Sequence, residues 1–405
     1  MLLCIATAVA IASRRLRVPY TVALVLTGLA LGTLGVVALP HLTKELLFAL
    51  FLPGLLFEAA YHLHFRELRA SALTIGILAV PGVVVAIALT ATVLVGVSAI
   101  LGTATSISWQ AALVFAAVIA ATDPVAVTAL FRQLAAPRRL EVLVESESLL
   151  NDGTSIVFLG LILAYLAGDE PTAWLLTLDF VRITFGGAAA GLAIGWGATH
   201  IIKQIDEPAI EITLTMIAAY GSFVVAEQLH CSGVIATVAA GVLCGNHGRT
   251  HAMSDTTRQA VDSFWAWVAF ALNSAVFLLL GAEVPVRVLA EAWAPIMLAA
   301  IAVLVARGIV VTGTTALLRR TREHIPFSWS AVITWGGLRG ALSMVLALAL
   351  PETLPYRSLI VTLTAGVVLV SLVGQGLTMG PLLRRLRVGR VQGEDQPVSL
   401  RRAHK

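Results

Sequence analysis

Three acidic residues, Asp123, Glu147 and Asp152, lie inside segments of the chain that are otherwise apolar. Asp123 belongs to the stretch Ala121-Thr-Asp-Pro124, and the other two belong to Glu145-Ser-Glu-Ser-Leu-Leu-Asn-Asp-Gly153. An ionised carboxylate at the centre of a bilayer costs about 2.5–3.5 kcal/mol on insertion scales, so such residues persist mainly where they bind ions or protons. These side chains therefore predict a pathway for cations and protons through a membrane.

The residues around Asp123 and Asp152 supply the oxygen atoms that a hard cation prefers. Pro124 removes a backbone donor and disfavours a helix at Asp123, which leaves carbonyl oxygens such as that of Thr122 beside the carboxylate. Ser148 precedes Asp152 by about one helical turn, so both side chains face one cavity. Carboxylate, hydroxyl and carbonyl oxygens suit an alkali cation. We predict that Asp152, Asp123, Thr122 and Ser148 bind a transported Na⁺, and that proton and cation compete there, which by itself gives antiport.

Four further polar residues are expected to support this site. Asn151 does not titrate, so we expect it to orient the backbone near Thr122. Arg307 and Arg339 lie within spans, where an unpaired guanidinium is very costly. We expect Glu147 to pair with Arg307 and to hold the core helices together, with Arg339 near a second helix break. The sequence is also compatible with the opposite pairing, so the salt-bridge candidates are Glu147, Arg307 and Arg339.

Glu58, near the inner end of the third apolar segment, leaves two alternatives open. It either lies in a cytoplasmic funnel that attracts cations or extends to the membrane surface. The nearby His62 and His64 are expected in a solvated loop. The sequence has no metal spacing of the HExxH type, and we expect no cofactor beyond the transported Na⁺ and H⁺.

Composition places these residues in a membrane protein. The chain is 58% hydrophobic and 12% charged, with a mean hydropathy of +0.91, whereas soluble domains have about 25% charged residues. Apolar segments long enough to cross about 30 Å of hydrocarbon recur along the chain. We predict about 13 transmembrane helices, with a first segment that is short for a span. The segments are residues 1–13, 20–39, 44–61, 71–100, 109–133, 141–167, 173–202, 209–229, 232–247, 261–281, 292–318, 328–351 and 356–382.

The basic residues predict the topology of these spans. With the N-terminus outside, most of the 27 Lys and Arg residues fall in inner loops and in the C-terminal segment. Lys44, Arg182, Arg287 and Arg357 fall on the outer side. This bias follows the positive-inside rule and requires an odd number of spans. It predicts a protein of the cell (inner) membrane with its C-terminus in the cytoplasm. Nucleic-acid binding is not expected, because the basic residues are scattered and lack an aromatic platform.

Two interrupted spans predict an inverted repeat. Pro124 should unwind the fifth span near its middle, and Gly336, Gly337 and Gly340 surround Arg339 in the twelfth. These spans are an odd number apart, so they cross the membrane in opposite directions. Paired broken helices in corresponding positions of two halves mark a transporter site near the bilayer midplane. The predicted fold class is therefore an all-α polytopic membrane protein with an inverted repeat.

We predict a single transmembrane domain over residues 1–387 and a short basic cytoplasmic tail over residues 388–405. The tail is too short to bury a core. Cys4, Cys231 and Cys244 lie in or beside apolar segments without CxxC spacing, so disulfides are not implied.

Several motifs resemble those of the monovalent cation:proton antiporter family, of the NhaP and NHE type. They are Pro19-Tyr-Thr-Val-Ala-Leu-Val-Leu-Thr-Gly28, Pro53-Gly-Leu-Leu-Phe-Glu58, Ala121-Thr-Asp-Pro-Val-Ala126, Glu147-Ser-Leu-Leu-Asn-Asp-Gly153 and Gly336-Gly-Leu-Arg-Gly340. The resemblance implies a homodimer and sodium/proton exchange by an elevator-like motion, with a role in pH homeostasis. It assigns ion binding to Thr122, Asp123, Ser148 and Asp152, and support to Asn151 and Glu147. The Asn-Asp pair is similar to the branch that exchanges one proton per cation.

Three other functions are compatible with parts of the sequence. Potassium/proton exchange would use the same oxygen atoms. An intramembrane aspartyl protease would need two facing aspartates that share a proton, but the Gly-x-Gly-Asp context is absent. A passive channel would be expected to use rings of like residues from several subunits. We therefore expect a transporter of monovalent cations and protons in membrane lipid, and not an enzyme.

Overall fold

The computed structural model describes residues 1–16, 19–34, 43–100, 107–168, 173–283 and 286–389, and within these ranges every regular element is a helix. Seven of the described helical segments are long and apolar enough to cross a membrane, and four shorter apolar segments accompany them. The predicted all-α membrane fold is confirmed. The end of the second predicted span and the tail from residue 390 onward lie outside the described residues.

Each predicted span coincides with one helix or with a short series of helices. The first part of the chain forms α1 (Leu2–Leu16), α2 (Tyr20–Leu34), α3 (Lys44–Leu46), η1 (Leu47–Phe51), α4 (Leu52–His62), α5 (Phe65–Ala70), α6 (Ala72–Ala79), α7 (Pro81–Ile100), α8 (Trp109–Val118), α9 (Val125–Gln133) and α10 (Arg138–Leu166). The middle forms α11 (Ala173–Ile202), α12 (Pro208–Met216), η2 (Ile217–Gly221), α13 (Ser222–Gln228), α14 (Gly233–Leu243), η3 (Cys244–Gly248), α15 (Arg249–His251) and α16 (Asp255–Ala282). The last part forms α17 (Val286–Glu291), α18 (Trp293–Leu317), η4 (Leu318–Arg320), α19 (Phe327–Trp335), α20 (Ala341–Leu348), α21 (Arg357–Val370), η5 (Ser371–Gln375) and α22 (Gly376–Arg385).

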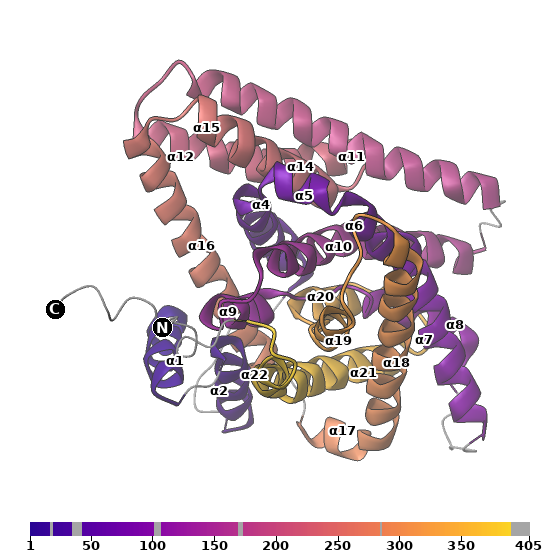
Figure 1. Cartoon of the computed structure of the whole chain (residues 1–405). Coiled ribbons are helices and arrows are strands. Elements are labelled where there is room, and N and C mark those ends of the chain that lie inside the picture. The colour runs from indigo at the N-terminus through magenta and orange to yellow at the C-terminus, as the bar shows by residue number, and fades with distance from the viewer. Residues whose placement is uncertain (17–18, 35–42, 101–106, 169–172, 284–285, 390–405) are drawn as a thin grey trace.

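The two predicted interruptions are present, and they meet in the interior. The fifth span is divided between α8 and α9, and the twelfth is divided between α19 and α20. Proline cannot donate a helical hydrogen bond, and Pro124 is the cap residue from which α9 starts. The backbone N–H of Asp123 donates to the carbonyl oxygen of Leu338 over 2.8 Å, so the two breaks are bonded to each other. In Figure 1, α9 and α20 accordingly lie near the centre of the molecule.

Helix α11 packs closely on α14 through the glycine repeat of Gly187, Gly191 and Gly195. A Cβ atom at Gly191 would overlap the carbonyl oxygen of Ala236, and one at Gly187 would overlap that of Ser232. Small residues let two backbones approach in this way in membranes. The repeat therefore serves packing within the chain, and the two helices run together along the top of Figure 1.

Helices α4 and α16, with η1, form a wall opposite the broken helices, which we call the facing wall. Phe57 of α4 and Trp265 of α16 pack with ring centroids 4.7 Å apart, and both are fully buried. Helix α16 also packs on α2 and α12, whereas α10 packs on α6 and α8. The facing wall also contacts α10 and α20 directly, and the cavity described below lies between the facing wall and the broken helices.

Candidate functional site

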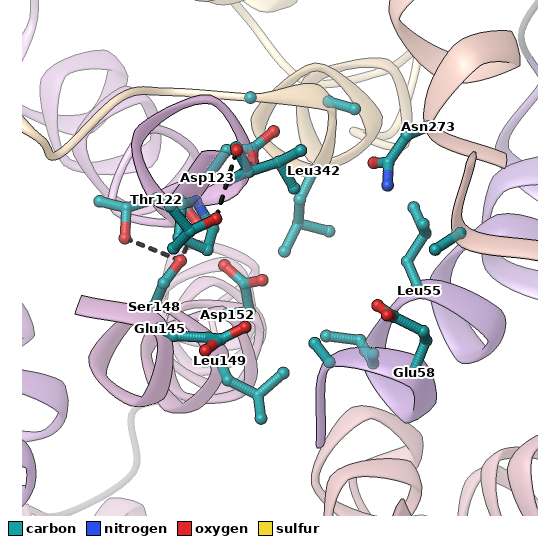
Figure 2. A pocket seen from close by; sticks show the side chains of 18 of the residues that line it. Leu55, Glu58, Thr122, Asp123, Glu145, Ser148, Leu149, Asp152, Asn273 and Leu342 are labelled. Carbon is teal, nitrogen blue, oxygen red and sulfur yellow. Dashed lines mark hydrogen bonds between the residues drawn. The ribbon is translucent and has the colours of Figure 1, made fainter. Parts of the chain in front are cut away.

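A cavity of about 630 Å³ separates the facing wall from the broken helices. Most of its surface is apolar, and Leu52, Leu55, Phe277 and Leu342 are among the residues that line it. Many of the polar residues on its surface belong to two groups. Asp123 and Asp152 lie beside the helix break with Thr122 and Ser148 (Figure 2), whereas the second group comes from α4 and the segment after it, α9, α10 and α15. This second group consists of Glu58, His62, His64, Arg132, Arg138, Glu145 and Arg249.

Asp123 is held by the break in the fifth span. Its Oδ1 accepts a hydrogen bond of 2.9 Å from the backbone N–H of Val125, in the first turn of α9. Its other oxygen lies against Gly340, where a Cβ atom would overlap Oδ2. Gly340 caps the start of α20, so the carboxylate lies near the N-terminal ends of two helices. The partial positive charge of helix N-termini stabilises a negative group placed there.

Thr122 is fixed to α10 by hydrogen bonds with two side chains. Asn151 accepts from the backbone N–H of Thr122 over 3.3 Å and donates to Thr122 Oγ1 over 2.8 Å. The Thr122 hydroxyl donates to Ser148 Oγ over 3.2 Å, and Ser148 donates to the carbonyl oxygen of Thr122. All three residues are buried. Asn151 thus orients the unwound backbone, which is the role that the sequence suggested for it.

Asp152 lies on the same face of α10 as Ser148, and both line the cavity. Its Oδ1 is buried, and no hydrogen bond to it is formed by the residues that the structure describes. A buried carboxylate oxygen without a partner is unfavourable unless a proton or a cation binds it. Asp152, Asp123, Thr122 and Ser148 together offer a set of oxygen atoms that suits a monovalent or divalent hard cation.

Of the two arginines considered from the sequence, Arg307 is the one that contacts Glu147. Its Nη1 and Nη2 atoms donate to Oε1 and Oε2 of Glu147, each over 2.9 Å. Such a bidentate pair fixes geometry as well as charge. Arg307 also donates to the carbonyl oxygen of Ile333, and Asn151 donates to Glu147 over 3.0 Å. The pair therefore ties α10 to α18 and α19, behind the cavity.

Arg339 contacts backbone carbonyl groups rather than a carboxylate. Its Nη1 atom donates to the carbonyl oxygens of Ile119, Ala120 and Ala121, over 2.5, 2.7 and 3.2 Å. These groups follow the C-terminus of α8, where helical carbonyls have no intrahelical partner and a cation is stabilising. Arg339 lies in the break of the twelfth span. It thus binds the carbonyl groups that the break in the fifth span leaves without helical partners.

Glu58 lines the cavity, where its Oε1 atom lies 3.3 Å from Nδ1 of His62. Two other polar residues of the cavity were not assigned a role from the sequence. Glu145 is found one turn before Ser148 on the same face of α10, a spacing that the sequence does contain. Asn273 comes from α16, far away in the chain, and only the tertiary structure brings it to the cavity (Figure 2).

Comparison with known proteins places this architecture in a family. A family model described as "Sodium/hydrogen exchanger, transmembrane" matches residues 1–385. The chain belongs to the sodium/hydrogen exchanger family. The exchanger is 38% identical over 384 residues to the Na(+)/H(+) antiporter ApNhaP of Aphanothece halophytica, which covers 94% of this chain and 72% of that protein. It is 39% identical over 357 residues to the Na(+)/H(+) antiporter NhaP of Pseudomonas aeruginosa, covering 85% of this chain and 82% of the relative.

The fold of this exchanger is also similar to a solved structure. The sodium proton antiporter MjNhaP1 from Methanocaldococcus jannaschii, determined at pH 8, matches with a TM-score of 0.78 over 95% of this chain and 96% of that chain. The sequence identity is 19%, so this likeness bears on the fold alone. Membership of a transporter family excludes the intramembrane protease considered from the sequence, and the chain is an integral membrane protein and not an enzyme.

Proposed function

We propose that this chain exchanges Na⁺ for H⁺ across a membrane, with Asp152 and Asp123 as the groups for which the two ions compete. The observation that carries the proposal is the buried Oδ1 atom of Asp152, a residue that lines the cavity. This oxygen has no hydrogen-bond partner among the described residues. When Na⁺ binds, the oxygens of Asp152, Asp123, Thr122 and Ser148 surround it and the proton leaves. When Na⁺ leaves, a proton neutralises the buried carboxylate, because an uncompensated charge there is unfavourable.

Alternating access would use the placement of the site between the facing wall and the broken helices. The cavity reaches Asp152 from the side of Glu58, Arg132 and Arg138, which is the cytoplasmic side in the proposed topology. Apolar residues such as Leu342 and Phe277 also line the cavity. A movement of the broken helices against the facing wall then exposes the site to the other side of the membrane. Glu58 and Glu145 attract cations toward the site from the cytoplasmic side.

The hydrogen bonds and the ion pair around the site make the broken helices and α10 move as one rigid unit. Asn151 fixes the Thr122 backbone, the Glu147–Arg307 pair ties α10 to α18 and α19, and Arg339 ties the two breaks together. The helices that carry the ion ligands are therefore expected to move together. A resident metal or cofactor has no part in this mechanism, since Na⁺ and H⁺ are its substrates.

The assignment of sodium follows the relatives named above, which are Na(+)/H(+) antiporters. The test is proton movement in everted vesicles that contain the chain. After respiration has acidified the lumen, addition of NaCl should release the trapped protons, and vesicles with an Asp152→Asn variant should not respond. A response to KCl alone would make the chain a potassium/proton exchanger, and no response to NaCl, LiCl or KCl would refute antiport.

The proposal includes the setting in which the chain works. It forms a homodimer in the cell (inner) membrane, with the N-terminus outside and the C-terminal tail in the cytoplasm, and it contributes to pH homeostasis. The distribution of Lys and Arg supports this orientation. Accessibility of a cysteine introduced near residue 389 to an impermeant reagent in whole cells tests it, since labelling from outside would contradict a cytoplasmic tail.

A further inference from the structure

The facing wall presents one polar side chain from α16 to the cavity. The residues that α16 contributes are Ala266, Ala269, Asn273, Val276 and Phe277. Their spacing corresponds to one face of the helix, and Asn273 is the one polar member. In Figure 2 its amide points into the cavity from the side opposite Asp123 and Asp152.

The amide of Asn273 has no hydrogen-bond partner among the residues that the structure describes. The next residue on the helix differs in this respect. Ser274 is fully buried, lies 2.7 Å from the Tyr20 hydroxyl and donates to the carbonyl oxygen of Phe270. A polar group on an apolar surface within a membrane is unfavourable unless something satisfies it. Helix packing therefore explains Ser274, whereas the half-buried amide of Asn273 is available to water or to a cation that enters the cavity.

Asn273 and Asp152 are each among the last residues with which their helix lines the cavity. The residues of α10 that line it are Glu145, Ser148, Leu149 and Asp152, and Asp152 is the last of these along the helix. On α16, Asn273 is followed in the lining only by Val276 and Phe277, about one helical turn further on. The two helices run in the same direction in the predicted topology. The amide and the carboxylate therefore lie on opposite sides of the cavity (Figure 2).

We propose that the side-chain oxygen of Asn273 is a specificity-determining ligand for the monovalent cation as it passes between the cavity and Asp152. The proposal rests on the antiport function proposed above and deepens it. An amide oxygen binds a hard cation that has lost part of its water. The amide does not titrate, so it acts on the cation and leaves the proton step to the carboxylates. A ligand on the facing wall is also left behind when the broken helices move.

The experiment measures exchange by the whole chain in proteoliposomes with a pH-sensitive dye inside. Asn273→Ala removes the oxygen, Asn273→Asp keeps one, and Ser274→Ala is the matched control on the same helix. We expect Asn273→Ala to raise the KM for Na⁺ about tenfold, the size expected when one hydrogen-bond-like contact to a charged partner is lost. The kcat and the pH profile should remain those of the parent chain. Asn273→Asp should have a KM no higher than that of the parent, and the ratio of KM values for Li⁺, Na⁺ and K⁺ should change in both variants.

Several results would overturn the inference. An unchanged KM for Na⁺ in Asn273→Ala would contradict it. If kcat then fell equally for Li⁺, Na⁺ and K⁺, the role of Asn273 would be a contact between helices. The same KM change in Ser274→Ala would attribute the effect to distortion of α16. A raised KM for Na⁺ in Asn273→Asp would contradict ligation by the side-chain oxygen. This test remains available if the Asn273→Ala variant fails to insert into the membrane. Failure of the antiport proposal is separate, since the parent chain itself would then show no cation-driven proton flux.

Discussion

The backbone N–H of Asp123 donates a hydrogen bond of 2.8 Å to the carbonyl oxygen of Leu338. This bond joins the break in the fifth span to the break in the twelfth. Each unwound segment leaves backbone groups that lipid cannot hydrogen-bond. Each segment supplies hydrogen-bonding groups to the other. Arg339 binds the free carbonyls at the end of α8, and Asp123 lies beside Gly340 at the start of α20. The proposed ion site is thus built on a paired interruption.

Asp152→Asn should abolish sodium-driven proton flux while the protein still inserts into the membrane. The amide cannot release a proton when Na⁺ binds, and the buried Oδ1 position loses its charge. Flux in proteoliposomes checks this. Asp255→Asn is the matched control, because the side chain of Asp255 is 88% exposed at the start of α16, and it should exchange at the parental rate. Near-parental flux in Asp152→Asn would remove this residue from the mechanism.

Glu147→Ala should lower the stability of the folded protein more than it alters ion selectivity. The substitution leaves the guanidinium of Arg307 buried without its counter-charge, which costs about 3–5 kcal/mol. The measurement is the melting temperature in detergent. Glu291→Ala is the control, since it breaks the exposed pair with Arg287, and exposed pairs contribute about 0–1 kcal/mol. Equal melting temperatures for Glu147→Ala and the parent would contradict a stabilising role for the buried pair.

Gly340→Ala should reduce the rate of exchange strongly. The added Cβ atom overlaps the carboxylate of Asp123, so either the carboxylate or the paired breaks must shift, and misplacement of a reacting group by about 1 Å can cost a hundredfold in rate. Gly96→Ala is the control, because a Cβ atom there meets no atom within 4 Å. Parental flux in the Gly340→Ala variant would show that the two breaks do not position Asp123.

Transport should be insensitive to the membrane potential. Asn151 is neutral and donates to Glu147 over 3.0 Å, so it adds no proton to the site, and Glu147 is neutralised by Arg307. We expect one proton to exchange for each Na⁺, which moves no net charge. The test imposes a potassium–valinomycin potential on proteoliposomes and follows sodium uptake at fixed ion gradients. Initial rates that depend strongly on the sign of the potential would indicate a different stoichiometry.

The sequence by itself determined the class of protein, the spans and the two interruptions. Long apolar segments have few alternatives to membrane helices, since lipid cannot hydrogen-bond the backbone. Proline and glycine act locally, so the breaks at Pro124 and at Gly336, Gly337 and Gly340 were predictable from their positions. The cluster of Ser148, Asn151 and Asp152 follows from helical spacing within α10, and Glu145 could have been added on the same ground.

Only the tertiary structure decided which distant groups meet. The sequence left both arginines open as partners of Glu147, because helix pairing depends on packing between segments more than 100 residues apart. The structure places Arg307 on Glu147 and Arg339 on the carbonyls after α8. It also brings Asn273 to the cavity, although nothing near residue 273 distinguishes that amide from others in apolar helices. Spacing along one helix fixes which side chains share a face, whereas the partner of that face is set by the fold.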